Sequence, residues 1–111
     1  MTYEEIFSTI KEKFKDADVS SITEHLAYQF NIEGEGEGIF YVEVKDGQLF
    51  IEPYEYYDRD VIYFCTADTL IKIMEGKLDP VLAFTVKKLK LEGDIGKALR
   101  LKDMLKGNKK K

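Results

Sequence analysis

The chain contains one histidine and one cysteine, His25 and Cys65, which are the side chains best suited to nucleophilic or metal chemistry. A neighbouring histidine can activate a cysteine thiol as a nucleophile. Both residues, however, stand in segments that we expect to form strands, and a cysteine among aromatic residues is more often a small buried hydrophobe. A tetrahedral zinc site has even less support, because the chain has no second histidine or cysteine to complete it. These residues therefore favour a protein that is not an enzyme and that holds no metal or other cofactor.

Glycines alternate with glutamates over residues 34–38, a composition that superficially suggests a phosphate-binding loop. The stretch lies between two expected strands rather than ahead of a helix, and its carboxylates would repel phosphate. Calcium binding is a second interpretation, but the acids here, Glu33, Glu35 and Glu37, lack the EF-hand spacing. We therefore expect a hairpin loop at this place. A further acidic group lies in a polar segment, where solvated acids are the norm; it comprises Glu55, Asp58 and Asp60.

Basic residues concentrate in the last quarter of a chain whose formal net charge is −4 and whose pI is about 5.1. The overall acidity argues against a nucleic-acid-binding protein, because such proteins usually present net positive charge to phosphate. One interpretation of the local excess is a solvated strand and helix face. The other is a patch that contacts anionic membrane lipids, where each basic side chain contributes about 1 kcal/mol. The candidate residues for this contact are Lys88, Lys90, Lys97 and Arg100.

The chain has 111 residues, of which 44% are hydrophobic and 34% charged, as expected of one globular domain. We assign residues 1–107 to this domain and residues 108–111 to a basic tail. No apolar run approaches the roughly 18 residues that cross a bilayer, and the first residues do not resemble a signal peptide. The expected location is therefore the cytoplasm.

The spacing of apolar residues predicts four helices and five strands. The apolar stripe of the first helix follows a capping box formed by Thr2 and Glu5. Strands follow where the period changes to two, and Asp46–Gly47 is a strong signal for a tight turn. The expected helices are 3–16, 67–75, one that begins at Pro80 and one that begins at Ile95, and the expected strands are 25–33, 39–45, 48–54, 61–65 and 88–92.

This order of elements predicts an α+β domain, in which a five-stranded, mainly antiparallel sheet has its helices gathered on one face. We expect consecutive strands to pair as a meander. The strand at 61–65 presents apolar residues to both faces, among them Ile62 and Phe64 on the side opposite Tyr63. The second face is therefore expected to be covered, by the N-terminal helix or by a second copy of the chain, unless the domain keeps an apolar interior larger than its own side chains need.

The segment from Met74 to Leu101 resembles the sterol carrier protein type 2 family. The features that carry the resemblance follow one another in the order typical of that family. They are a helix end at Gly76, a new helix start at Asp79–Pro80, the strand 88–92, and a glycine–aspartate turn before a leucine-rich helix. The resemblance extends over nearly the whole domain, and the chain looks like a stand-alone, prokaryotic-like member. It implies a hydrophobic tunnel between sheet and helices and the non-catalytic binding and transfer of fatty acids, fatty acyl-CoA, phospholipids or sterols. The chain does not end in the peroxisomal Ser-Lys-Leu signal.

Apolar residues on the elements that face each other across the space between sheet and helices are the candidates for the tunnel lining. The last helix would act as a lid, since it lies between Gly93 and Gly107. The lining residues that we expect to contact a lipid or acyl chain are Phe40, Val42, Leu70, Met74, Leu82, Phe84, Leu101, Met104 and Leu105. The alternative is a protein-interaction or dimerisation module, such as a homodimer, in which the cavity is residual.

Overall fold

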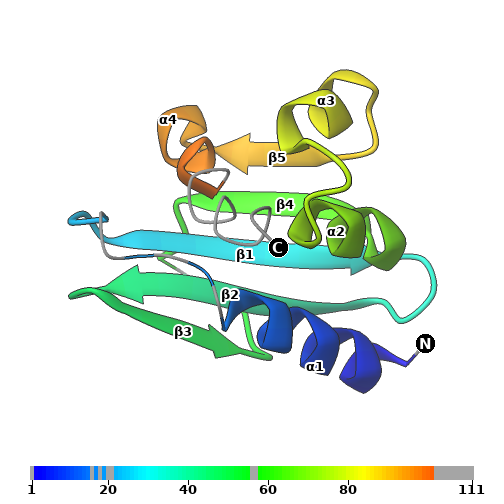
Figure 1. Ribbon diagram of the computed structural model, residues 1–111, viewed down its shortest axis with the longest axis horizontal. Helices are drawn as coiled ribbons and strands as arrows, with labels where there is room; N and C mark the ends of the chain where they lie inside the picture. Colours follow the sequence, from blue (N-terminus) through cyan, green and yellow to red (C-terminus); the bar gives the residue numbers. More distant parts are fainter. Residues whose placement is uncertain (1, 16, 18, 20–21, 56–57, 102–111) are drawn as a thin grey trace.

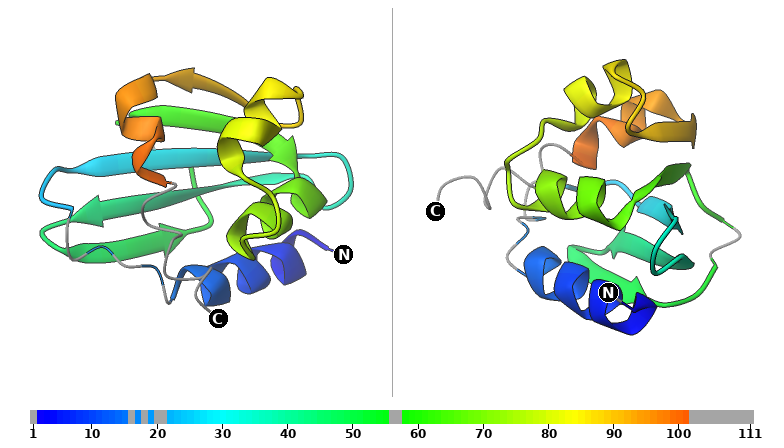
Figure 2. Two further views of the ribbon diagram at one scale, coloured as in Figure 1. Left: turned by 45° about the horizontal axis from the view of Figure 1, so that its top comes forward. Right: turned by 90° about the vertical axis from the view of Figure 1, so that its right-hand side faces the viewer.

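The computed structural model describes residues 2–15, 17, 19, 22–55 and 58–101 of the chain. In the described part of the chain, four helices lie over one face of a five-stranded sheet (Figures 1 and 2). The elements in chain order are α1 (Tyr3–Phe14), β1 (Leu26–Glu33), β2 (Gly38–Lys45), β3 (Gln48–Glu52), β4 (Val61–Thr66), α2 (Ala67–Met74), α3 (Pro80–Thr85), β5 (Lys90–Gly93) and α4 (Ile95–Ala98). The predicted fold class is therefore confirmed.

Each helix begins at a residue whose side chain caps it. The predicted capping box is present, because Thr2 Oγ1 accepts from Glu5 N at 3.2 Å and Glu5 Oε1 accepts from Thr2 N at 2.8 Å. Thr66 caps α2, and Asp79 and Asp94 cap α3 and α4. These caps supply acceptors for backbone N–H groups that have no partner inside the helix.

The strand order is β3-β2-β1-β4-β5, and three of its four pairings are antiparallel. The β1–β4 pairing is parallel, so the predicted meander is wrong at the step from β3 to β4. The segment 53–60 is too long for a tight hairpin. Glu52 pairs with Tyr41, Tyr41 with Gln29, and Gln29 with Ile62, so β3 ends at the level of the sheet where β4 begins. The described residues of this connection, 53–55 and 58–60, lie on the side of the sheet opposite the helices (Figure 2).

The last residues of the crossover, Arg59 and Asp60, contact β1. Asp60 N donates to Ala27 O at 2.7 Å, and Asp60 Oδ2 accepts from Ala27 N at 2.9 Å. Arg59 Nη1 donates to Gln29 Oε1 at 3.4 Å, and Gln29 is only 3% exposed. The expectation that the N-terminal helix covers the second face of the sheet is wrong, because the buried side of α1 packs on the same face of the sheet as α2.

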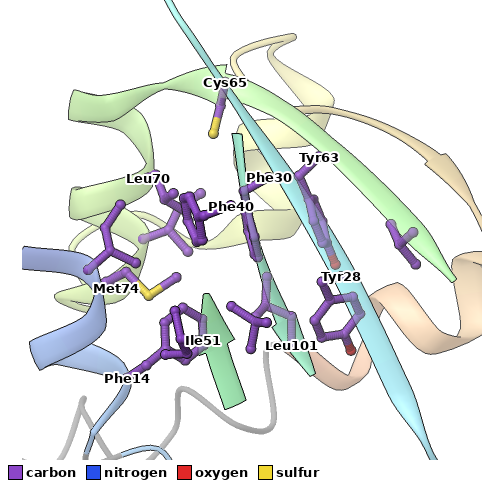
Figure 3. Close-up of a cluster of buried hydrophobic side chains, with 14 of the residues drawn as sticks. Phe14, Tyr28, Phe30, Phe40, Ile51, Tyr63, Cys65, Leu70, Met74 and Leu101 are labelled. Atoms are coloured by element: carbon purple, nitrogen blue, oxygen red, sulfur yellow. The ribbon is translucent and has the colours of Figure 1, made fainter. Parts of the chain in front are cut away.

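Aromatic rings form a row across the helix-covered face of the sheet. Phe30 on β1 stacks on Phe40 of β2 at 5.0 Å between ring centroids, and on Tyr63 of β4 at 4.9 Å. Phe14 of α1 meets Phe30 edge-on (Figure 3). All four rings are buried, and this row occupies the middle of the space between sheet and helices.

Candidate functional site

A cavity of about 110 Å³ lies between α3, β5, α4 and the strand β4. It is lined by Tyr63, Pro80, Val81, Phe84, Leu89, Leu91, Ile95, Ala98, Leu99 and Leu101. Tyr63 supplies the one polar side-chain atom of this set, and its hydroxyl already donates to Ala98 O at 3.1 Å. The walls therefore offer apolar surface and no unpartnered side-chain polar group.

The cavity opens to solvent through large apolar side chains that are themselves half exposed. Val81 and Phe84 of α3 are 47% and 50% exposed, and Ile95 and Leu99 at α4 are each 56% exposed. Exposed apolar side chains scattered singly are ordinary, but here four of them surround one apolar cavity. This clustering is typical of a site that accepts an apolar ligand.

The wall formed by α4 is held to the sheet by two tyrosines. Tyr28 Oη donates to Lys97 O at 2.5 Å and Tyr63 Oη donates to Ala98 O, so that both bonds reach the C-terminal end of α4. Burial raises the pKa of the Tyr63 hydroxyl far above its ordinary value, which keeps the hydroxyl protonated as a donor. The hydrogen bond that Lys97 Nζ donates to Asp60 Oδ1 at 3.1 Å raises the pKa of Lys97 and adds a third attachment.

The residues expected to line a tunnel fall into distinct places. Phe84 and Leu101 line the cavity, and Leu101 lies among the buried side chains of the sheet (Figure 3). Leu82 is 53% exposed on α3 and is not among the lining residues. Four others, Phe40, Val42, Leu70 and Met74, lie in the packed core and do not line this cavity. Met104 and Leu105 lie outside the described residues.

Eight of the lining residues were not among those expected from the sequence. They are Tyr63, Pro80, Val81, Leu89, Leu91, Ile95, Ala98 and Leu99. For Pro80 and Val81 the available sequence signal is the composition of residues 80–86, which are apolar on nearly every side of a short helix; no such signal singles out the other six. A helix that is apolar all round is either buried or faces an apolar partner, and the sequence does not say which.

His25 and Cys65 lie far apart. His25 Nε2 is 2.6 Å from Glu43 Oε2 at the start of β1, whereas Cys65 pairs with Ile32 near the other end of that strand. The seven residue steps from His25 to Ile32 span about 23 Å at the rise of an extended strand. Burial, with a smaller contribution from the charge of Glu33, raises the pKa of Cys65 to about 12. The thiol is therefore protonated and away from any histidine base, as befits a core residue.

Two of the four basic residues expected to contact a membrane are already paired. Lys97 binds Asp60, and Arg100 Nε donates to Glu24 Oε1 at 2.9 Å. Lys88 and Lys90 are exposed, with no acidic partner in the described part of the chain. That part also holds no group of three acidic, histidine or cysteine residues placed to bind a metal ion. None of the described helices has the length and hydropathy to span a bilayer.

A model of the SCP-2 sterol transfer family matches residues 4–106. The chain therefore belongs to the SCP-2 sterol transfer family. Mouse (Mus musculus) hydroxysteroid dehydrogenase-like protein 2 is 32% identical to it over 103 residues, which cover 92% of this chain and 21% of that protein. This chain thus spans between about one-fifth and one-quarter of the length of the curated relatives it matches. SCP-2 membership implies lipid binding or transfer as the general function.

Solved structures share the SCP-2 fold at lower identity. The sec-alkyl sulfatase PisA1 from Pseudomonas sp., as a double mutant, superposes with a TM-score of 0.74 and 20% identity, over 86% of this chain and 15% of that one. The palmitated SCP2L2 of Aedes aegypti superposes with a TM-score of 0.68 and 21% identity, over 96% of both chains. At these identities the likeness shows the fold alone.

Proposed function

We propose that this SCP-2 domain binds the acyl chain of a lipid in the cavity between α3, β5 and α4 and carries it without chemical change. The observation that supports this proposal most directly is the lining, which is apolar apart from one tyrosine hydroxyl that is already hydrogen-bonded. Each methylene group transferred from water into such a cavity contributes about 0.8 kcal/mol. Affinity can therefore arise without a polar recognition group.

The size of the cavity sets how a ligand enters. Ligand pockets usually measure about 300–1,000 Å³, whereas this cavity measures about 110 Å³. It accommodates a few methylene groups of a chain, and a longer ligand requires α3 and α4 to separate or extends out between them. Core residues such as Phe40 and Met74 would contact ligand only if the helices moved away from the sheet.

The class of ligand is proposed to be a fatty acid, a fatty acyl-CoA or a phospholipid, rather than a sterol. A narrow apolar cavity with an open rim fits a flexible chain better than a rigid ring system. The palmitated relative from Aedes aegypti supports an acyl ligand for this fold. Displacement by palmitate but not by cholesterol would support this choice, and the reverse would assign a sterol.

The test is a titration with a fluorescent fatty acid, free of vesicles, on two matched double variants. Ile95→Ser with Leu99→Ser removes apolar side chains from the rim, and we expect binding to weaken about tenfold. Leu82→Ser with Val86→Ser removes side chains of similar size and exposure that do not line the cavity, and we expect affinity close to that of the wild type.

Two outcomes would contradict the proposal. One is the absence of saturable binding by the wild type, and the other is an equal loss in both double variants. Either result would favour the alternative function, an interaction or dimerisation module in which the cavity is residual.

A further inference from the structure

The helix α3 exposes more apolar surface than its packing requires. Ala83 is its one buried residue, whereas Val81, Leu82, Phe84 and the C-cap residue Val86 are each about half exposed. Val81 and Phe84 line the cavity, but Leu82 and Val86 do not. α3 lies at the edge of the molecule, on the opposite side from α1 (Figure 1). The side of α3 that points away from the cavity, which we call its outer side, therefore has no neighbouring element among the described residues.

Two lysines follow this apolar surface directly, and backbone hydrogen bonds hold their main chain there. The chain turns sharply at Lys87, whose φ is 66°, and its N–H donates to Phe84 O at 3.1 Å. The N–H of Lys88 donates to Ala83 O at 2.9 Å, so both lysines are held at the C-terminal end of α3. Both are exposed, and neither has an acidic partner in the described part of the chain.

We propose that the outer side of α3, formed by Leu82, Val86, Lys87 and Lys88, docks this domain on bilayers that contain anionic lipids. Apolar side chains insert at the boundary between headgroups and acyl chains, and flanking lysines attract the negative headgroups. This arrangement revises the membrane contact expected from the sequence. Lys97 and Arg100 take no part, since Asp60 and Glu24 pair with them.

The surface charge favours a membrane over a second copy of the chain as the partner. A symmetric dimer formed through α3 would bring the lysine pairs of both copies to a surface whose one acid on this helix and its caps is Asp79, and that carboxylate already accepts from Val81 N and Leu82 N. An anionic bilayer neutralises the same lysines and receives the apolar side chains.

The docking surface adjoins the mouth of the cavity. Val81 and Phe84 belong to the same short helix as Leu82, so a docked α3 would place the rim at the level of the lipid chains. A role of this arrangement in lipid exchange rests on the proposed function, that the cavity binds an acyl chain. Docking of α3 on a bilayer does not depend on that proposal.

The experiment is co-sedimentation of the purified chain with phosphatidylcholine vesicles, with and without phosphatidylglycerol. We expect binding to the anionic vesicles that weakens as salt is raised. Leu82→Ser with Val86→Ser should reduce it about tenfold. Lys88→Gln should reduce it about fivefold, and Lys45→Gln, which changes an exposed lysine on β2, should leave it unchanged.

The same variants distinguish failure of docking from failure of ligand binding. Loss of vesicle binding in the Leu82/Val86 variant, with fluorescent fatty acid binding retained, supports docking by α3. Equal binding to vesicles with and without phosphatidylglycerol would overturn the proposal, as would an equal loss in Lys45→Gln and Lys88→Gln. A dimer in sedimentation velocity that the Leu82/Val86 variant dissociates would instead assign α3 to self-association. Absence of fatty acid binding by the wild type would overturn the proposed function but not the docking.

Discussion

The two pairs of helices cover the same face of the sheet in different ways. α1 and α2 bury three and four of their side chains, whereas α3 and α4 each bury a single alanine. α1 packs on the Phe30 and Phe40 part of the stacked aromatic row, whereas Tyr63, at the other end of the row, lines the apolar cavity under α3 and α4. One sheet therefore supports a close-packed half that supplies stability and a loosely covered half that retains apolar surface for binding.

The largest contrast is expected between two phenylalanines. Phe30→Ala removes the central ring of the buried row and should lower the free energy of unfolding by about 3–5 kcal/mol. Phe84→Ala removes a half-exposed ring from α3 and should cost less than about 1 kcal/mol. Urea unfolding of both variants measures the difference. Similar losses would show that α3 belongs to the core, and the distinction between the two halves would then be wrong.

A smaller loss of stability is expected when a hydrogen bond between the sheet and α4 is removed. Tyr63→Phe leaves the Ala98 carbonyl without its donor, and we expect a loss of about 1–2 kcal/mol. Amide hydrogen exchange at Ala98 and Leu99 should accelerate, while exchange in α1 stays unchanged. Tyr54→Phe is the matched control, because Tyr54 is 64% exposed. If exchange at α4 is insensitive to Tyr63→Phe, the tyrosine is not what holds this helix.

The smallest effect is a pH dependence that originates in the close-packed half. The thiol of Cys65 ionises near pH 8.5 when exposed, and its folded-state pKa is about 12. Between these values the unfolded state loses a proton that the folded state keeps, so stability decreases as pH rises. We compare the free energy of unfolding at pH 7.5 with that at a pH of about 9.5. Over this range the wild type should lose about 1 kcal/mol more than Cys65→Ala does. Parallel pH profiles would show that the thiol is accessible to solvent.

Local patterns in the sequence predicted most of the elements, because periodicity, caps and turn residues act over a few positions. The Asp46–Gly47 turn is an example, with both residues at positive φ as a tight hairpin requires. The pairing of β4 with β1 was missed, because the choice between a hairpin and a crossover depends on contacts far apart in the chain. The length of the segment 53–60 was the available signal.

The site was predictable only in part, for a related reason. Phe84 and Leu101 were expected and do line the cavity, but periodicity does not distinguish an apolar residue in the core from one at a rim. Phe40 and Leu82 illustrate this, since one is fully buried and the other half exposed. Which apolar residues remain uncovered is decided by how closely the helices approach the sheet, and no single segment encodes that distance.

The parallel pairing of β1 with β4 also has a consequence for the order of folding. β1, β2 and β3 are joined by short connections, whereas the β4 contact joins Tyr28 to Val61 and closes a much longer loop. Closing a longer loop costs more chain entropy, so we expect the three-stranded part to form first and the strands and helices around the cavity to assemble on it. Pulse-labelling hydrogen exchange during refolding would show this as later protection of Leu91 than of Phe40, and simultaneous protection would contradict it. Lipid bound in the cavity would then act on the last step of folding and delay the first step of unfolding.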